Sequence, residues 1–390
     1  MTDSSGDDHG TDEDKQAARR LAAWRGAERR LARRAKEATL GERLARLTED
    51  ASSVADLAGD LDFYGDGIVA VLEEKVARLL GKEAAAFFPS GTMAQQVALR
   101  CWAGRTGNAT VALHPLAHPE VHERDAFSAL TDLRTVHPTR EPRQPTAEEV
   151  EELDEPFGAL MLELPLRDAG FVLPTWQELV DVCEAARVRD AVVHFDGARL
   201  WECTEHFGRP LDEIAALADS VYVSFYKTLG GISGAALAGP RSFIDEARAW
   251  RHRYGGQVFR QFPQVIAALA GLERELPKLP SYVRHARVVA RALREGFAGA
   301  GVAWAGIHPE TPHTHEFRVW LPYDAEALTE AGVAQAEETK VSLFGRWWPA
   351  DKVPGMSVCE VTVAEPGLKW SADDVRAAVA DFVRRLPGRA

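Results

Sequence analysis

Short apolar segments alternate along this chain with amphipathic helical segments, and this alternation restricts the possible folds more than any other feature. The spacing of turn residues predicts strands at Ala84–Phe88, Ala159–Leu164, Ala191–Phe195 and Ser220–Phe225. A helix is expected between the second and third of the predicted sheet strands, where Thr175 and Glu178 form a capping-box pattern. Wholly apolar strands separated by helices are typical of a mostly parallel sheet covered on both faces. We therefore predict an α/β fold.

The ends of the chain differ from this middle part. Residues 1–14 are acidic and almost free of apolar side chains, which predicts disorder. Residues 15–50 are rich in Arg, Ala and Leu and predict a helical arm that packs on a neighbouring subunit or domain, or docks on an acidic partner. Residues 51–278 are expected to form the large α/β domain. Residues 279–390 predict a smaller α+β domain with a long helix, two alternating strands and a terminal helix.

Composition excludes several classes of function. The 390 residues carry a net charge of −13, which disfavours non-specific binding of nucleic acid. No apolar run is long enough to span a bilayer, and the acidic start does not resemble a secretory signal. The four cysteines form no CxxC pair, so neither a disulfide framework nor a thiolate metal site is indicated. We expect a cytoplasmic protein without nucleic-acid or membrane partners.

The first candidate site is the turn after the first predicted strand. Ser90, Gly91 and Thr92 lie between that strand and an apolar helix. Free backbone N–H groups at a helix start, two hydroxyls and a glycine that permits close approach favour phosphate binding. The alternative is that Ser90 is an ordinary N-cap residue.

Two further candidates follow buried strands one strand–helix–strand step apart. Asp196 ends the apolar segment that contains His194, and a buried carboxylate needs a cationic partner, such as a protonated ring nitrogen or Arg199. Lys227 follows the next apolar segment, where partial burial lowers an amine's pKa and makes it nucleophilic. The alternatives are an internal Asp–Arg pair and an exposed surface lysine. His194 is interpreted as a core histidine.

A phosphate cradle, a strand-end carboxylate and a strand-end lysine together match the needs of pyridoxal 5'-phosphate (PLP). In these positions the chain resembles the threonine aldolase/β-eliminating lyase group of the fold type I PLP-dependent enzymes, over roughly Tyr64 to Leu272. The resemblance rests on five segments: Tyr64-Gly65-Asp66, Leu72 through Ala84, Pro89 through Ala94, His194 through Arg199, and Asp219 through Lys227. A later Gly-Gly-x-x-Arg-Gln-like segment is seen as Gly255-Gly256 through Arg260-Gln261.

The resemblance implies an aspartate aminotransferase-like large domain, a homodimer or homotetramer, and a set of residue roles. Lys227 would form the Schiff base with PLP, and Asp196 would pair with the pyridine nitrogen. His118 would stack on the ring and serve in proton transfer. Arg199 would bind the substrate carboxylate and brace Asp196. The phosphate would be held by Ser90, Gly91, Thr92, Ser224 and, across a dimer interface, Arg260.

The chain departs from the group where substrate is expected to bind. The group's early Arg-Ser-Asp-Thr stretch is missing, and its Glu-Asn-Thr-His segment is replaced by residues 163–167, Glu-Leu-Pro-Leu-Arg. The arginine expected on the last strand is also missing, although Arg346 offers a substitute. The cofactor half of the site is therefore expected to be complete, and the substrate half to be changed.

The leading functional prediction is aldol cleavage of a β-hydroxy amino acid, such as L-threonine, to glycine and an aldehyde, with His118 or a water it orients as the base. The alternatives are PLP-dependent β-elimination, racemisation or transamination, and a non-catalytic subunit that retains the fold. A metal site is not favoured: His114, His118 and His122 have helical spacing, but Pro115 and Pro119 interrupt it. The pair His313 and His315 is an equally weak candidate.

Overall fold

The computed structural model describes residues 12–32, 38–350 and 353–387, which divide into two compact units. The larger unit comprises residues 44–284 and 312–315. The smaller unit contains the described residues up to Arg43 together with 285–311 and those from Glu316 onwards. After the larger unit's main segment, the chain passes to the smaller unit between residues 284 and 285. The sequence predicted this boundary between residues 278 and 279. In the described part of the chain, no helix is both long enough and apolar enough to cross a bilayer.

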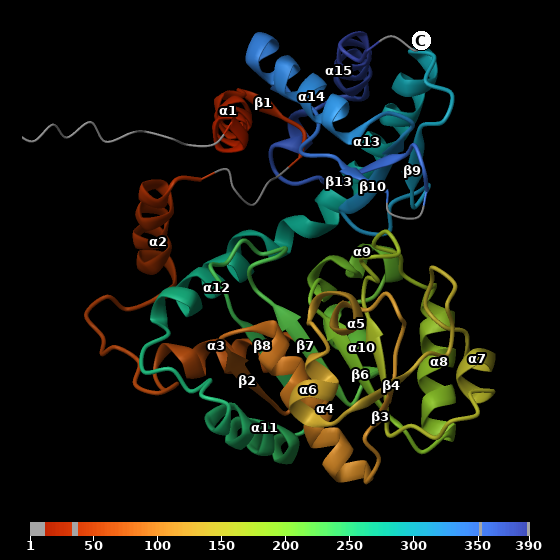
Figure 1. Cartoon of the computed structure of the whole chain (residues 1–390). Coiled ribbons are helices and arrows are strands. Elements are labelled where there is room, and N and C mark those ends of the chain that lie inside the picture. The colour runs from red at the N-terminus through yellow and green to blue at the C-terminus, as the bar shows by residue number, and fades with distance from the viewer. Residues whose placement is uncertain (1–11, 33–37, 351–352, 388–390) are drawn as a thin grey trace, which may run out of the picture. The chain divides into compact units, whose positions relative to one another are not determined.

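A seven-stranded sheet forms the centre of the larger unit (Figure 1). Its strands lie in the order β2 (Ala84–Phe88), β8 (Ala235–Gly239), β7 (Ser220–Ser224), β6 (Val192–Gly197), β5 (Ala159–Glu163), β3 (Thr110–Ala112) and β4 (Arg134–Val136). β8 is antiparallel to both of its neighbours, and the other pairs are parallel. Every residue of β2, β5, β7 and β8 is buried, as continuous apolar runs predict for a sheet covered on both faces.

Helices connect and cover these strands. The longer ones are α3 (Ile68–Leu79), α4 (Gly91–Thr106), α8 (Trp176–Val188), α11 (Arg241–Arg253) and α12 (Phe262–Arg274). The short ones are α5 (His118–His122), α6 (Ala126–Thr131), α7 (Ala147–Glu151), α9 (Thr204–Phe207) and α10 (Leu211–Ala216). The capping box expected at the start of α8 is present, because Thr175 accepts the Glu178 backbone N–H and Glu178 accepts that of Thr175.

The smaller unit contains a four-stranded antiparallel sheet in the order β12 (Trp348–Pro349), β13 (Ser357–Thr362), β10 (Glu316–Leu321) and β9 (Gly306–His308). Side chains of β10 and β13 alternate between buried and partly exposed, as their alternating sequence predicts. The helices of this part of the chain are α13 (Leu279–Gly299), α14 (Ala325–Thr339) and α15 (Ala372–Arg384). Phe344, Trp347 and Phe382 pack together in its core.

The expected helical arm over residues 15–50 is not continuous. Helix α1 (Asp12–Gly26) is followed by β1 (Arg29–Arg30), which pairs in parallel with β11 (Val341–Ser342). Helix α2 (Leu40–Val54) is a separate helix further along the chain. The interruption has a physical reason, since Leu31 and Ala32 are buried in the core of the smaller unit.

Helix α1 docks on an acidic helix of its own chain. Arg19 pairs with Glu330 and Glu337 of α14 at 2.8 and 2.7 Å, and Arg20 pairs with Glu330 at 2.8 Å. The basic face of α1 is therefore neutralised within the smaller unit. Most of the tail predicted to be disordered lies outside the described residues, and residues 12–14 belong to α1.

Candidate active site

Three polar side chains lie side by side in register on the central strands, two of them near the carboxyl ends of β5 and β6. Glu163 is the last residue of β5, and it is paired in register with Asp196 of β6. Asp196 is in turn paired with Tyr222 of β7. Because residues in register on neighbouring strands point to the same face, the sheet places two carboxyl groups and a phenol next to one another. The carboxyl edge of such a sheet is where α/β proteins bind ligands.

Asp196 is only 2% exposed and accepts the backbone N–H of Ala198 at 3.1 Å. Burial raises its pKa, while the positive charges of Lys227 and His118 oppose this shift. Glu163 is also buried, and burial together with the charge of Asp196 raises its pKa to about 7. The pair needs a positive partner for both carboxyls to ionise, which a protonated pyridine ring would supply.

Lys227 lies three residues after the end of β7 and is partly buried. Burial lowers the pKa of its amine, and so does the nearby charge of Arg199, whereas Asp196 and Glu163 act in the opposite direction. A lowered pKa increases the fraction of neutral amine, which is the form that attacks a carbonyl carbon. The next residue, Thr228, is buried, and its hydroxyl donates a hydrogen bond to the Glu202 carboxylate at 3.3 Å.

The turn before α4 has the properties expected of an anion cradle. Ser90 is the N-cap of α4, and its hydroxyl accepts the Met93 backbone N–H at 3.4 Å. This is the N-cap role that was the alternative to phosphate binding. A Cβ atom at Gly91 would lie 2.2 Å from the Tyr222 hydroxyl, so only glycine fits. The Ser224 hydroxyl is buried without a hydrogen-bond partner among the described residues. Thr92, in the first turn of α4, is half-buried. These features fit a bound phosphate.

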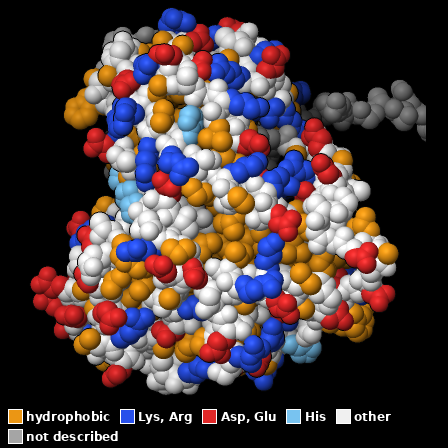
Figure 2. Space-filling view, turned by 180° about the vertical axis from the view of Figure 1, so that it is seen from behind, with side chains coloured by type: hydrophobic (Ala, Val, Ile, Leu, Met, Phe, Trp, Pro, Cys, Tyr) orange, Lys and Arg blue, Asp and Glu red, His pale blue; other side chains and the backbone are white. Residues whose placement is uncertain are grey.

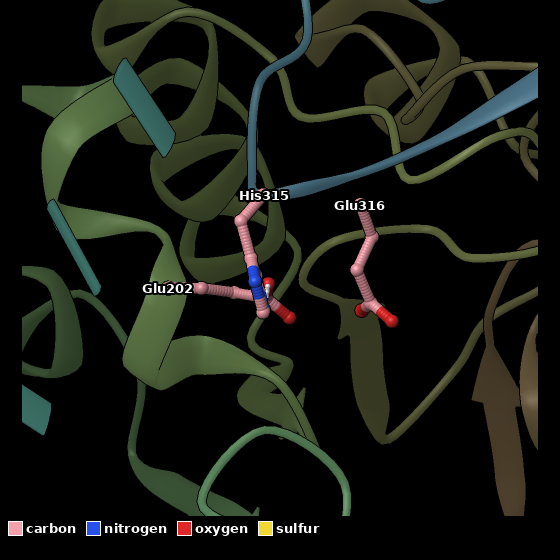
Figure 3. Close-up of side chains that lie close together, drawn as sticks. All are labelled: Glu202, His315 and Glu316. Carbon is pink, nitrogen blue, oxygen red and sulfur yellow. Dashed lines mark ion pairs between the residues drawn. The ribbon is translucent and has the colours of Figure 1, made fainter. Parts of the chain in front are cut away.

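Arg199 belongs to a buried chain of charged groups. Its Nε lies 3.9 Å from Oε1 of Glu202, and Oε2 of Glu202 lies 2.7 Å from Nε2 of His315. Figure 3 shows the Glu202 carboxylate and the His315 imidazole facing each other, and both side chains are buried. Glu316, also labelled there, starts β10 of the smaller unit. The other histidine of this segment, His313, accepts the Leu173 backbone N–H at 2.9 Å.

The histidines near α5 have separate partners. His114 Nε2 lies 2.6 Å from the Glu141 carbonyl oxygen, and α5 begins only at His118. His118 pairs through Nδ1 with Glu123 at 3.3 Å, and His122 pairs through Nε2 with Asp168 at 2.6 Å. The His118 backbone N–H also donates to Glu163 at 2.7 Å, which fixes α5 to the end of β5. His118 therefore belongs to the cluster around Lys227.

Three further residues considered from the sequence are His194, Arg260 and Arg346. His194 is a core histidine, since its ring nitrogens lie 2.7 Å from the Ser220 hydroxyl and 2.7 Å from the Gln95 side-chain oxygen. Burial lowers the pKa of His194 to about 3. Arg260 donates to the carbonyl oxygen of Asp62 and lies over the ring of Phe259 at 4.6 Å. Arg346 is exposed between β11 and β12 of the smaller unit.

Sequence reasoning missed two groups of this site, Glu163 and Tyr222. A signal for Glu163 was present, because it ends an apolar strand in the same way as Asp196 does. Tyr222 stood inside an apolar strand, and its contact with the start of α4 depends on the order of β2, β8 and β7 in the sheet. That order was not predicted.

The fold and the lysine–carboxylate arrangement define a fold type I PLP-dependent enzyme. The same fold is found in the structure of a candidate L-allo-threonine aldolase from Listeria monocytogenes EGD-E, with a TM-score of 0.85 and 32% identity, covering 95% of this chain and 99% of that one. A family model described as beta-eliminating lyase matches residues 47–307. The chain belongs to this family and is a PLP-dependent lyase.

Two relatives named as L-threonine aldolases are similar to this chain in sequence. The low specificity L-threonine aldolase of Escherichia coli O157:H7 is 31% identical over 248 residues, which is 62% of this chain and 73% of the relative. The low-specificity L-threonine aldolase 1 of Arabidopsis thaliana is 30% identical over 237 residues, which is 57% of this chain and 65% of the relative. The alignment thus spans somewhat less than two thirds of the plant protein.

Proposed function

We propose that this lyase cleaves the Cα–Cβ bond of a β-hydroxy amino acid such as L-threonine, releasing glycine and an aldehyde. The observation that carries the proposal is the cluster of Lys227 with Asp196 and Glu163 at the carboxyl ends of β5, β6 and β7. The resemblance to proteins named as L-threonine aldolases supports the choice of bond.

The chain's own residues fit PLP. When bound, PLP supplies an aldehyde that condenses with amines and a ring that withdraws electrons from the substrate Cα. Lys227 would hold the aldehyde carbon, and Asp196 would keep a proton on the ring nitrogen. The backbone N–H groups at Gly91 and Thr92, together with the unpartnered Ser224 hydroxyl, would hold the phosphate.

Residues of the larger unit would also bind the substrate. Arg199, held by Glu202, would bind the α-carboxylate. The proton of the β-hydroxyl needs a basic group nearby, and helix α5 supplies imidazoles at this place. The resemblance assigns this role to His118, which Glu123 holds through Nδ1. Arg346, which is exposed, would be a second ligand of the substrate carboxylate.

A second candidate function is β-elimination, racemisation or transamination of another amino acid by the same cofactor. It is favoured by Arg167, which stands in the segment where the related enzymes carry Glu-Asn-Thr-His. The charge of Arg167 acts on Lys227 and lowers the pKa of its amine. A different cation near the reacting lysine is consistent with a different substrate.

We also propose a homodimer or homotetramer in the cytosol. Hydrophobic side chains are gathered over a wide area of the face shown in Figure 2. Among the large hydrophobic side chains that are exposed on the larger unit are the aromatic residues Phe63, Tyr64 and Phe259. Such surfaces are typical of protein–protein contacts. All four cysteines are buried free thiols, which suits a reducing compartment.

The function is tested by aldehyde release from L-threonine and L-allo-threonine. We expect the wild type to release acetaldehyde and Lys227→Ala to lose this activity together with the visible absorbance of the bound cofactor. Lys75→Ala is the matched control, because Lys75 pairs with Glu273 on the helical surface. If the wild type forms a keto acid or a racemised product and no aldehyde, the second candidate function is correct instead.

A further inference from the structure

A second imidazole stands beside His118 on the short helix α5. The ring centroids of His118 and His122 are 5.2 Å apart, with an angle of 47° between the ring planes. Each ring has its own carboxylate: Glu123 lies 3.3 Å from Nδ1 of His118, and Asp168 lies 2.6 Å from Nε2 of His122. The His122–Asp168 contact is the shorter of the two and has the length of a charge-assisted hydrogen bond.

The loop that carries Asp168 is tied to the active site. Arg167 donates from Nη1 to Oδ1 of Asp168 at 3.2 Å, and the same nitrogen lies 3.5 Å from Nε2 of His122. The Arg167 backbone N–H donates to Glu163 at 3.3 Å, and its charge acts on Lys227. Since Glu163 also accepts the His118 backbone N–H, the buried carboxyl end of β5 positions both α5 and the Asp168 loop.

The two imidazoles have different neighbours. The charge of His118 acts on Asp196, which is the group that would pair with the ring nitrogen of the cofactor. His122 lies one helical turn further on and contacts the loop of residues 167–168, where the chain departs from the related enzymes. The His122 side chain is 39% exposed, whereas that of Asp168 is 16% exposed, so the imidazole is the more accessible member of the pair.

The hydrogen bond to Asp168 fixes the tautomer of His122. Nε2–H donates to the carboxylate, so the lone pair of the neutral ring is on Nδ1. A carboxylate in this position also stabilises the imidazolium that forms when Nδ1 accepts a proton. The pair therefore has the parts of a general base: an accessible ring with a free lone pair and a fixed anion behind it.

We propose that His122, held by Asp168, accepts the proton of the substrate's β-hydroxyl group during Cα–Cβ cleavage. This inference rests on the proposed aldol cleavage and moves the base from His118 to His122, leaving His118 in contact with the cofactor ring. The O–H bond breaks and its proton binds Nδ1 of His122. The O–H electron pair becomes the second bond of the aldehyde carbonyl, and the Cα–Cβ electron pair stays with Cα. His122 then releases its proton to water while Cα takes one up, so protons balance.

The experiment compares two reactions of the cofactor-loaded enzyme. Aldehyde release from L-threonine or L-allo-threonine needs a base for the hydroxyl proton, whereas exchange of the glycine α-proton in D₂O breaks only a Cα–H bond. We expect His122→Asn to lower kcat for aldehyde release by about 100-fold or more, the usual contribution of a general base. Glycine exchange and visible cofactor absorbance are expected to stay at wild-type values. Asp168→Asn is expected to lower kcat in the same direction.

The matched control is His252→Asn. Like His122, His252 is exposed and hydrogen-bonded to a side chain. Its Nδ1 lies 2.7 Å from Oε1 of Gln257. We expect both reactions of this variant to match the wild type.

Two results would overturn the inference while leaving the proposed function intact. One is a His122→Asn enzyme that releases aldehyde at the wild-type rate. The other is an equal loss of aldehyde release and glycine exchange, which would show a general effect on the site. A wild type that cleaves no β-hydroxy amino acid would instead refute the proposed function, and this inference with it.

Discussion

At the scale of single residues, the buried carboxyls Glu163 and Asp196 determine the electrostatics of the site. They are adjacent in register on β5 and β6, and the nearby positive groups are Lys227, His118 and Arg167. Two buried acids that share a few cations cannot both ionise freely, so one of them holds a proton near neutral pH. Burial raises the pKa of Glu163 to about 7, which makes it the group that responds in this range.

The first prediction concerns the pH dependence of stability through Glu163. Its pKa is raised from 4.5 to about 7 on folding, so the folded state binds the extra proton. Its contribution to stability is therefore complete below pH 4.5 and is lost as the pH rises through 7. We expect Tm of the cofactor-free wild type to fall between pH 5 and 8, and that of Glu163→Gln to fall less.

Glu149→Gln serves as the control for this prediction. Its hydrogen bonds with Arg143 lower the pKa of Glu149 to about 2, so this carboxylate is ionised throughout the range. The substitution should lower Tm by a similar amount at pH 5 and pH 8. Parallel curves for wild type and Glu163→Gln would contradict the assignment of the raised pKa to Glu163.

The second prediction concerns the glycine at the start of α4. A Cβ atom at Gly91 would lie 2.2 Å from the hydroxyl oxygen and 3.0 Å from Cζ of the buried Tyr222. Gly91→Ala must therefore displace that ring, which costs about 1–3 kcal/mol of stability and disturbs the phosphate cradle. We expect a lower Tm and a weaker cofactor Kd, measured by absorbance titration.

Gly104, in the same helix, provides a matched control. A Cβ at this exposed position meets no atom within 4 Å. Gly104→Ala should stabilise the helix by about 0.5–1 kcal/mol and leave the cofactor Kd unchanged. If Gly91→Ala binds cofactor as Gly104→Ala does, the start of α4 is not the phosphate site.

Sequence predicts a residue of the site when the residue carries its own local signal. Asp196 lies near the end of the buried strand β6, and Gly91 and Lys227 come shortly after the buried strands β2 and β7. Their positions could therefore be inferred without knowing the sheet order. Glu163 also ends an apolar strand, but its place beside Asp196, like that of Tyr222, follows from the register of β5, β6 and β7. Register depends on contacts between segments far apart in the chain, which a single sequence does not show.

At the scale of elements, the predicted strands agree with the structure where the apolar run is at least five residues long. Ala84–Phe88 matches β2, and the three later runs match β5, β6 and β7 within two residues at either end. The strands β3 and β4 have three residues each and were not predicted. The Ala-rich β8 was also missed, because alanine and glycine have low strand propensity and only tertiary packing makes this segment a strand.

The third prediction tests the local signal that did identify an element. The Thr175 side chain caps α8 by accepting the backbone N–H of Glu178 at 3.3 Å. Thr175→Ala leaves that N–H without its partner and should lower stability by about 1 kcal/mol. We expect a lower midpoint in urea for this variant.

Thr48→Ala removes the same side chain from the middle of α2, where the hydroxyl donates a hydrogen bond to the Leu44 carbonyl four residues earlier. Because alanine is the better helix former, this control should leave the midpoint unchanged or raise it. Equal effects of the two substitutions would mean that the cap contributes nothing beyond helix propensity.

At the scale of the whole molecule, the sequence predicts a second domain from the change in composition near residue 280, and the smaller unit of the structure also contains the described residues up to Arg43. The segment around β1 belongs to the smaller unit because Leu31 and Ala32 enter its core and β1 pairs with β11. The acidic helix α14 likewise supplies the partner of the basic helix α1. Both contacts join segments about 300 residues apart, which local patterns do not report.

The last prediction concerns assembly, for which the larger unit presents an apolar surface. Phe63, Tyr64 and Phe259 pack edge to face, with centroid separations between 4.9 and 5.4 Å, yet each ring is about half exposed. The Tyr64 backbone N–H donates to the Phe259 carbonyl at 3.3 Å, so the cluster is held in place. A fixed aromatic patch open to water is typical of a surface that another protein covers. Arg260 lies over the Phe259 ring, so a second copy bound here would meet that arginine.

If the proposed oligomer forms through this cluster, Phe259→Asp, alone or with Phe63→Asp, shifts it towards monomer in sedimentation velocity. A buried aspartate without a partner is costly in an interface but harmless on an open surface. Trp304→Asp is the control, since Trp304 is 74% exposed and belongs to the smaller unit. A monomeric wild type, or an oligomer that survives the Phe259 substitution and dissociates with the Trp304 one, would show that this cluster is not the contact between subunits.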